Sequence, residues 1–289
     1  MPNEFIQSCE KLSELFHARY LGPGLNACPR KDDDPWESLR FFLSGYAFER
    51  QGRSQDYGPV AADVMREAAG QQLGLGSSST IWQSFADKMR NQGLNCACNP
   101  LCPLGWRYTR SYRGQAVQSV TQKMSIVELI VQGLHGACIV PWARQMVESD
   151  RIRTAHNALR RVNGIDSKIA SLYLRDVAVA HFIQPTRDRV LLQPIDTWLR
   201  FVSRMCSENW NLDDDGCAAF VVANSEQPER ANQGIWYFCA QACGSSSYLV
   251  RRAHADQARR DDLLRSHLRT LSAGDGAARE FAARWGVQL

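Results

Sequence analysis

Apolar residues along this 289-residue chain recur mainly at helical spacing, and the every-second-residue alternation of a half-buried strand is nearly absent. The segment 36–50 shows the pattern well, because it places Leu39, Phe42, Leu43 and Tyr46 on one face of a helix. Further helices are expected over 60–69, 81–90, 151–162, 167–178, 234–244 and 248–271. The stretch 92–119 carries Gly, Pro and Cys and is predicted to be a long irregular connection. The sequence therefore predicts an all-α protein.

The length allows two compact lobes. We expect helices of residues 1–59 to pack with the C-terminal lobe, and residues 60–178 to form a helical bundle that ends in a helical hairpin at 151–178. Residues 179–289 are expected to form the C-terminal lobe. This organisation predicts two helical lobes with a cleft between them.

Hydropathy indicates where in the cell the protein is located, and the cysteine pattern indicates which cofactors it could bind. No apolar run approaches the length of a membrane span, and residues 1–10 lack the pattern of a signal peptide. We therefore expect a cytoplasmic monomer with no membrane partner, associated with the nucleoid if the source is prokaryotic. Ten cysteines without an export signal argue against a disulfide framework. Cys96, Cys98 and Cys102 are close enough to suggest a metal, but no second cluster completes a site, and we predict no metal or cofactor.

The hairpin at 151–178 consists of two predicted helices joined by Asn163-Gly164-Ile165-Asp166. Gly164 permits a tight turn, Ile165 can anchor the turn to the core, and either Asp166 or Ser167 can cap the second helix. Such a hairpin exposes backbone N–H groups and a helix N-terminus, which bind phosphate. Between Arg151 and Arg204 the chain has ten Lys/Arg and four Asp, a local excess of six positive charges. This excess either neutralises phosphates or forms a solvated helix face.

Two segments together resemble a known family. They are Gly164-Ile165-Asp166-Ser167-Lys168-Ile169-Ala170-Ser171-Leu172-Tyr173-Leu174 and Pro194-Ile195-Asp196-Thr197-Trp198-Leu199-Arg200. Their order and content resemble the helix-hairpin-helix DNA glycosylase superfamily, specifically the endonuclease III group. The 28 residues from Lys168 to Asp196 exceed the endonuclease III spacing and look more like the archaeal 8-oxoguanine glycosylase branch.

The resemblance implies a catalytic pair. Lys168 matches the family's nucleophilic lysine, and Asp196 matches its catalytic aspartate. A carboxylate can stabilise the positive charge that develops on the sugar, and an amine can attack the anomeric carbon to form a Schiff base. The lysine must be neutral to attack, so we expect partial burial of Lys168. A lysine and an aspartate at such positions are, taken alone, more often a surface lysine and a plain N-cap, and it is the joint placement of Lys168 and Asp196 that favours catalysis.

The resemblance also suggests residues that contact double-stranded DNA around a damaged base. Gly164, Ile165 and Ser167 would contact the DNA backbone, together with Arg200. Tyr46 would fill the gap left by an extruded base, although it fits a core aromatic as well. A weaker set could line the base pocket, and each member also fits a helical core or surface: Gln51, Trp198 and Trp236.

The chain departs from the family at two points. Asp166 replaces the second hairpin glycine, and its carboxylate beside a phosphate would be repulsive. The spacing of four cysteines that follows the catalytic aspartate in endonuclease III is also missing, so we expect no iron–sulfur cluster. The predicted function is a bifunctional DNA glycosylase with AP-lyase activity in base excision repair, with 8-oxoguanine favoured. Two alternatives stay open: a non-catalytic helix-hairpin-helix DNA-binding protein, and a monofunctional glycosylase that uses water and Asp196.

Overall fold

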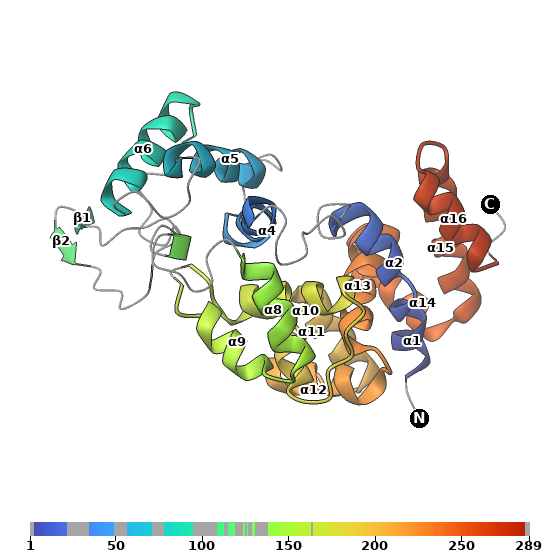
Figure 1. Cartoon of the computed structure of the whole chain (residues 1–289). Helices are drawn as coiled ribbons and strands as arrows, with labels where there is room; N and C mark the ends of the chain where they lie inside the picture. Colours follow the sequence, from blue (N-terminus) through green and yellow to red (C-terminus); the bar gives the residue numbers. More distant parts are fainter. Residues whose placement is uncertain are drawn as a thin grey trace. The chain divides into compact units, whose positions relative to one another are not determined.

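A computed structural model describes residues 3–21, 35–48, 57–70, 78–94, 109–112, 115–118, 124, 126, 129–130, 138–162 and 164–286. The chain forms two compact units, and each is described by itself. Unit 1 comprises residues 1–23 and 178–289, and unit 2 comprises residues 24–177. The division falls within helix α10 (Ser167–Ala180), between Val177 and Ala178. Both units consist mostly of helices, which confirms the all-α prediction (Figure 1).

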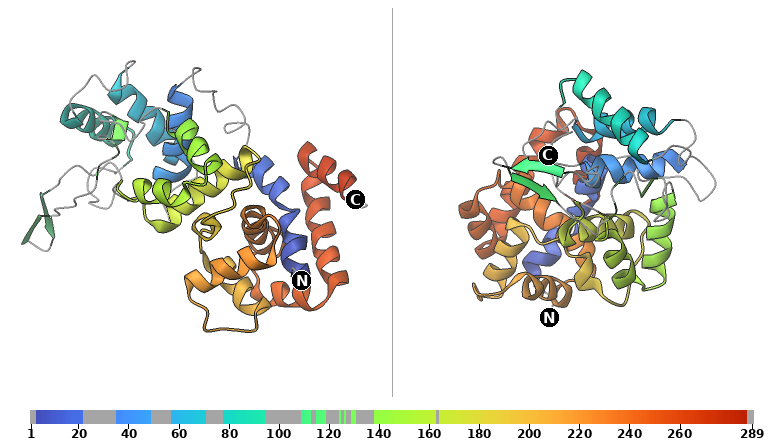
Figure 2. Two further views of the ribbon diagram at one scale, coloured as in Figure 1. Left: turned by 60° about the horizontal axis from the view of Figure 1, so that its bottom comes forward. Right: turned by 90° about the vertical axis from the view of Figure 1, so that its left-hand side faces the viewer.

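Unit 1 combines the N-terminal helices with most of the C-terminal half of the chain. In chain order its elements are α1 (Glu4–Glu10), α2 (Ser13–Phe16), π-helix η1 (His17–Leu21), 3-10 helix η4 (Arg189–Leu192), α11 (Thr197–Cys206), α12 (Asp214–Asn224), α13 (Pro228–Tyr237), π-helix η5 (Phe238–Ala242), α14 (Ser247–Ala255), α15 (Gln257–Ser272) and α16 (Gly276–Arg284). The N-terminal helices α1 and α2 lie between α13 and the pair α15–α16, as the blue, orange and red ribbons of Figure 2 show.

Unit 2 contains the middle of the chain. Its elements are α4 (Pro35–Phe42), π-helix η2 (Leu43–Ala47), α5 (Tyr57–Ala69), α6 (Ser78–Asn91), strands β1 (Thr109–Tyr112) and β2 (Gln115–Gln118), α8 (Ile139–Glu148), α9 (Ile152–Leu159) and the first part of α10. Helix α4 contacts both α5 and α8, and α5 packs against α6. Among the described residues of this unit, β1 and β2 are the strands, and they pair antiparallel.

Two features differ from the sequence predictions. The N-terminal segment that packs with the C-terminal half ends at residue 23 rather than at 59, because α4 and η2 bury their apolar face against α5, α8 and α10 in unit 2. The β1–β2 hairpin lies in the stretch predicted to be irregular. Its strands, Thr-Arg-Ser-Tyr and Gln-Ala-Val-Gln, carry too little apolar alternation to indicate a strand in the sequence.

The core of unit 1 depends on a close approach between α1 and α13. An ideal Cβ placed on Gly234 would lie 1.7 Å from the Cys9 carbonyl oxygen, so any other residue would force the helices apart. The buried side chains Phe5 and Phe238 pack edge to face beside this crossing, with ring centroids 5.7 Å apart. The N-terminal helix is therefore an integral part of this core.

The core of unit 2 joins α4, η2 and α10 through aromatic rings. Tyr173 lies with its ring centroid 4.9 Å from Phe42 and 5.0 Å from Tyr46, edge to face in both cases. The Tyr46 hydroxyl donates a 2.9 Å hydrogen bond to Asp176 Oδ2, and Arg175 Nε donates to Asp176 Oδ1 at 2.8 Å. Arg175 and Asp176 are each 2% exposed, so the core encloses a buried ion pair.

None of the helices in the described residues combines the length and the apolar character that a membrane span requires.

Candidate functional site

The turn between α9 and α10 is built by Gly164 and Asp166. Gly164 adopts φ +81°, a left-handed conformation that favours glycine. Asp166 Oδ1 accepts a 2.9 Å hydrogen bond from the Ile169 N–H, so Asp166 caps α10, which settles the choice between Asp166 and Ser167. Ile165 is 1% exposed and anchors the turn to the core, as the sequence predicts.

His156 fixes the start of α10 from the neighbouring helix. Its Nε2 lies 3.2 Å from the Ser167 carbonyl oxygen and 3.3 Å from the hydroxyls of Ser167 and Ser171. Burial lowers the pKa of His156, with the charges of Arg160 and Arg153 adding to the effect. A neutral imidazole therefore holds the hairpin together, a role that the sequence alone did not indicate.

We predict that the free energy of unfolding of both units falls as the pH drops below about 6.5. The folded-state pKa of His156 lies below the ordinary value of 6.5, so the unfolded chain binds the proton first, and stability is lost as the pH falls from 6.5 towards the folded pKa. Burial also lowers the pKa of His254 and of His267, so these two residues cause the same loss of stability at low pH in unit 1. Melting temperatures measured between pH 8 and pH 5 check this. His156→Gln should give a shallower decline, and a flat or rising profile below pH 6.5 would contradict it.

Lys168 lies in the first turn of α10 and is exposed. Within the described part of the chain its ammonium group has neither a hydrogen bond nor an ion pair. Within its own unit Lys168 points away from the buried face that Ala170 and Tyr173 form, and the predicted partial burial between two lobes stays a prediction. Arg160 and Arg161 are also exposed, just before the turn, so the hairpin presents a basic surface.

Asp196 is the N-cap of α11 in unit 1, as the sequence predicts. Its Oδ1 accepts a 2.7 Å hydrogen bond from the Leu199 N–H. The residue is half-buried, and its Oδ2 has no hydrogen-bond partner among the described residues. Burial raises the pKa of Cys239 well above its usual value, and the negative charge of Asp196 contributes, which indicates that the carboxylate lies close to this thiol. One oxygen is thus held by the helix, and the other is available.

Tyr46 is not a DNA wedge in this structure. Its side chain is 3% exposed, its ring packs against Tyr173, and burial raises the pKa of its hydroxyl, which donates to Asp176. The early helix contributes Tyr46 to the core because the apolar stripe that suggested a pocket wall is itself the packing face. The DNA-filling prediction for Tyr46 is therefore wrong.

The remaining predicted site residues have structural contacts. Arg200 forms a bidentate ion pair with Asp214, with Nε–Oδ1 and Nη2–Oδ2 distances of 2.9 and 3.0 Å. The half-buried Trp198 packs edge to face on Phe201, and the half-buried Trp236 packs in the same way on Phe16. Ser167 is exposed beside His156. Gln51, like Cys96, Cys98 and Cys102, lies outside the described residues.

Several of the positive side chains between Arg151 and Arg204 bind acceptors within the protein. Arg175 pairs with Asp176, Arg189 pairs with Glu229, and Arg204 donates to the Leu212 carbonyl oxygen. These arginines stabilise the fold. The exposed basic groups that remain for a partner therefore concentrate near the α9–α10 turn.

Four of the five cysteines in unit 1 are buried, and the fifth, Cys206, is half-buried. Burial raises the pKa of Cys206 and of Cys243 to about 12, so both thiols stay protonated at neutral pH. In the described ranges, no group of three or more His, Cys, Asp or Glu side chains is arranged to hold a metal ion.

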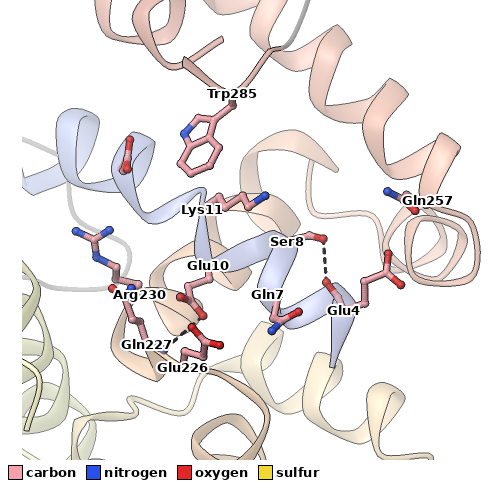
Figure 3. Close-up of a pocket in the computed structure, with 11 residues that line it drawn as sticks. Glu4, Gln7, Ser8, Glu10, Lys11, Glu226, Gln227, Arg230, Gln257 and Trp285 are labelled. Atoms are coloured by element: carbon pink, nitrogen blue, oxygen red, sulfur yellow. Dashed lines mark hydrogen bonds between the residues drawn. The ribbon is translucent and has the colours of Figure 1, made fainter. Parts of the chain in front are cut away.

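A cavity of about 480 Å³ opens beside α1 and α2 in unit 1 (Figure 3). Its lining includes four glutamates and two basic residues, and the Lys11 ammonium lies 5.0 Å from the centroid of the Trp285 ring. Glu10 Oε2 accepts hydrogen bonds from the Ser225 hydroxyl (2.7 Å) and the Gln227 N–H (3.4 Å). None of the residues predicted for catalysis or base recognition lines this cavity, and its charged lining does not suit a stacked base.

Comparison with known proteins gives one relevant similarity. The chain is 26% identical over 198 residues to an uncharacterized protein of Methanocaldococcus jannaschii, an alignment that covers 64% of this chain and 45% of that protein. The chain thus spans less than half the length of this relative. No model of a known protein family matches the chain, and no solved structure matches it.

Proposed function

We propose that this protein is a bifunctional DNA glycosylase and AP lyase that excises a damaged base from double-stranded DNA. In this proposal α9, the Gly164 turn and α10 form a helix-hairpin-helix that grips the DNA backbone. Lys168 is the nucleophile, and Asp196 is the carboxylate that stabilises the reacting sugar. The observation that carries the proposal is Lys168 itself, an exposed lysine in the first turn of α10 that lies next to a basic turn and has no ion-pair partner among the described residues.

The local charges at the turn support binding of a phosphate backbone. The positive end of α10 and the exposed Arg160, Arg161 and Lys168 all favour an anion. Asp166 is the one acidic residue of the turn, and its Oδ1 is occupied by the Ile169 N–H. Its repulsion of phosphate is therefore reduced, and the loss of the second hairpin glycine is compatible with DNA binding.

The proposed reaction uses both residues on one deoxyribose. The Lys168 amine attacks C1′, the bond from C1′ to the base nitrogen breaks, and the base leaves with the bonding electrons and takes up a proton. The free Asp196 Oδ2 stabilises the positive charge on the sugar and can accept the proton that the lysine releases. Ring opening gives a Schiff base, and loss of a proton from C2′ then expels the 3′ phosphate.

The exposure of Lys168 favours a second candidate. Nothing in the described structure withdraws this amine from water. A monofunctional glycosylase would instead use Asp196 to activate water, with Lys168 contacting the backbone. In that case base release would proceed without strand cleavage. A non-catalytic DNA-binding protein would show neither.

A panel of duplexes with single lesions tests the proposal. We expect release of 8-oxoguanine with strand cleavage, ahead of thymine glycol, uracil or an alkylated base, as the long Lys168–Asp196 spacing suggests. Binding of undamaged duplex should weaken steeply with salt, as expected for phosphate contacts. Preferential release of another base would overturn the substrate assignment, and base release without cleavage would favour the second candidate. If the protein binds DNA in a salt-dependent way but releases no base, the alternative of a non-catalytic DNA-binding protein would be the one that remains.

A further inference from the structure

Arg251 of α14 lies against two aromatic rings, Phe201 of α11 and Trp210 in the segment after it, and Tyr248 and Arg252 adjoin it on α14 at helical spacing. We call this the aromatic–arginine surface, and it consists of Phe201, Trp210, Tyr248, Arg251 and Arg252. Trp210 is 47% exposed and Tyr248 is 62% exposed. Large aromatic side chains rarely stay this exposed without a partner when they lie together.

The two guanidinium groups are held against the rings. Arg251 Cζ lies 4.9 Å from the Trp210 centroid and 5.2 Å from the Phe201 centroid, and these two rings meet edge to face at 5.8 Å. Arg252 Nη1 donates a 3.1 Å hydrogen bond to the Tyr248 hydroxyl, and its Cζ lies 5.8 Å from that ring. The guanidinium groups are thus oriented by aromatic contacts rather than by acids.

This arrangement differs from that of several other arginines in unit 1. Neither Arg251 nor Arg252 has a carboxylate partner in the described parts of the chain. Asp256, the acidic residue that follows Arg252, uses Oδ1 to accept a hydrogen bond from the Arg259 N–H at the start of α15. By contrast, six other arginines of unit 1 form ion pairs with carboxylates: Arg19, Arg189, Arg200, Arg260, Arg265 and Arg284.

A guanidinium that stacks on a ring keeps its N–H edges free, and these edges match the oxygens of a phosphate. The outer faces of Trp210 and Tyr248 are open to solvent and can stack on nucleobases. We propose that the aromatic–arginine surface binds single-stranded nucleic acid, with phosphates at Arg251 and Arg252 and bases on Trp210 and Tyr248.

A single strand fits this surface better than the other anionic partners. In a duplex the base faces are stacked on one another, so the exposed rings would find nothing to stack on. An acidic polypeptide would satisfy the guanidinium groups but would leave the aromatic faces in water. A single strand supplies both phosphates and unstacked bases. The surface shares α11 with Asp196, but the binding proposed here does not depend on excision chemistry.

The test measures binding of a fluorescein-labelled 15-mer of oligodeoxythymidylate by fluorescence anisotropy. Trp210→Leu and Tyr248→Leu should each weaken binding about tenfold, because each removes a stacking face. Trp210→Phe keeps a face and should bind within about twofold of the unmodified protein. Arg251→Gln with Arg252→Gln should weaken binding and lower the salt slope by about 1.4, as expected when two phosphate contacts are lost. The matched control is Arg265→Gln, an exposed arginine that pairs with Asp262.

Melting temperatures of all variants confirm that they are folded. Unchanged affinity in the Trp210 and Tyr248 variants would overturn the proposal, and so would an equal loss in Arg265→Gln. Polyglutamate that competes as well as the oligonucleotide at equal charge would show a general anion surface and would also overturn it. The 15-mer carries no lesion and its binding involves no excision, so failure of this proposal and failure of the proposed excision are distinguishable.

Discussion

Asp196→Asn is expected to reduce base release by about a hundredfold or more, because it removes the negative charge that would stabilise the sugar cation. Asparagine is as good an N-cap as aspartate, so the hydrogen bond from the Leu199 N–H and the start of α11 should persist. The melting temperature should therefore stay nearly unchanged while turnover collapses. Single-turnover release of 8-oxoguanine from a duplex, measured alongside thermal unfolding, separates the two effects.

Asp213→Asn is the matched control. Asp213 caps α12 in the same unit with the same geometry, since its Oδ1 accepts a 2.7 Å hydrogen bond from the Gly216 N–H. This change should leave both turnover and stability close to normal. Near-normal turnover in Asp196→Asn would reduce Asp196 to a structural cap and would remove the carboxylate from the proposed mechanism.

Asp176→Ala is expected to have the largest effect on stability, with a loss of about 3–5 kcal/mol in the free energy of unfolding. The carboxylate is buried, receives the Tyr46 hydroxyl and pairs with Arg175. Its removal leaves a buried guanidinium without its counterion and a buried hydroxyl without its acceptor. Urea denaturation that reports on unit 2 measures the change.

Asp63→Ala provides the comparison within the same unit. Asp63 pairs with Arg40 at 3.0 Å, but both side chains are well exposed, at 57% and 38%. An exposed pair of this kind contributes about 0–1 kcal/mol. If Asp176→Ala cost no more than Asp63→Ala, the buried pair would not be the stabilising centre of this core.

The sequence predicts the helices well because their apolar residues follow the helical period closely. The segment 36–50 corresponds to α4 and η2, and the predicted helix over 167–178 corresponds to α10. The N-cap role of Asp196 is also confirmed, since a polar cap before an apolar stripe is a local signal. The single helix expected over 248–271 divides instead into α14 and α15 at Asp256, whose backbone is extended and whose carboxylate caps α15.

Tertiary partners are harder to predict than helices. Tyr46 would lie on an apolar stripe whether that stripe faced a core or a DNA pocket. Its hydrogen bond to Asp176, 130 residues away, shows that it faces the core. The same holds for residues 35–48, which pack in unit 2 through Tyr173 rather than with the C-terminal half. Ion pairs are equally hard to predict from sequence. Arg200 is expected from the resemblance to contact DNA, but it pairs with Asp214, 14 residues later.

The assignment of Lys168 and Asp196 as a catalytic pair comes from the family resemblance and not from the local sequence pattern around either residue. The two residues belong to different units, and the structure describes each in its own surroundings. Lys168 is exposed and unpaired within the described chain, and Asp196 keeps one free oxygen. Both properties are compatible with a reaction at a sugar.

Reductive trapping tests the central proposal most directly. The protein is incubated with an 8-oxoguanine duplex and borohydride, and the covalent protein–DNA adduct is quantified by gel electrophoresis. The adduct should form with the unmodified protein and should map to Lys168 by mass spectrometry. Lys88→Gln, an exposed lysine of the same unit that pairs with Glu67, should trap normally, whereas Lys168→Gln should bind the duplex without trapping. Equal trapping by Lys168→Gln, or an adduct mapped to another residue, would contradict the assignment of Lys168 as the nucleophile.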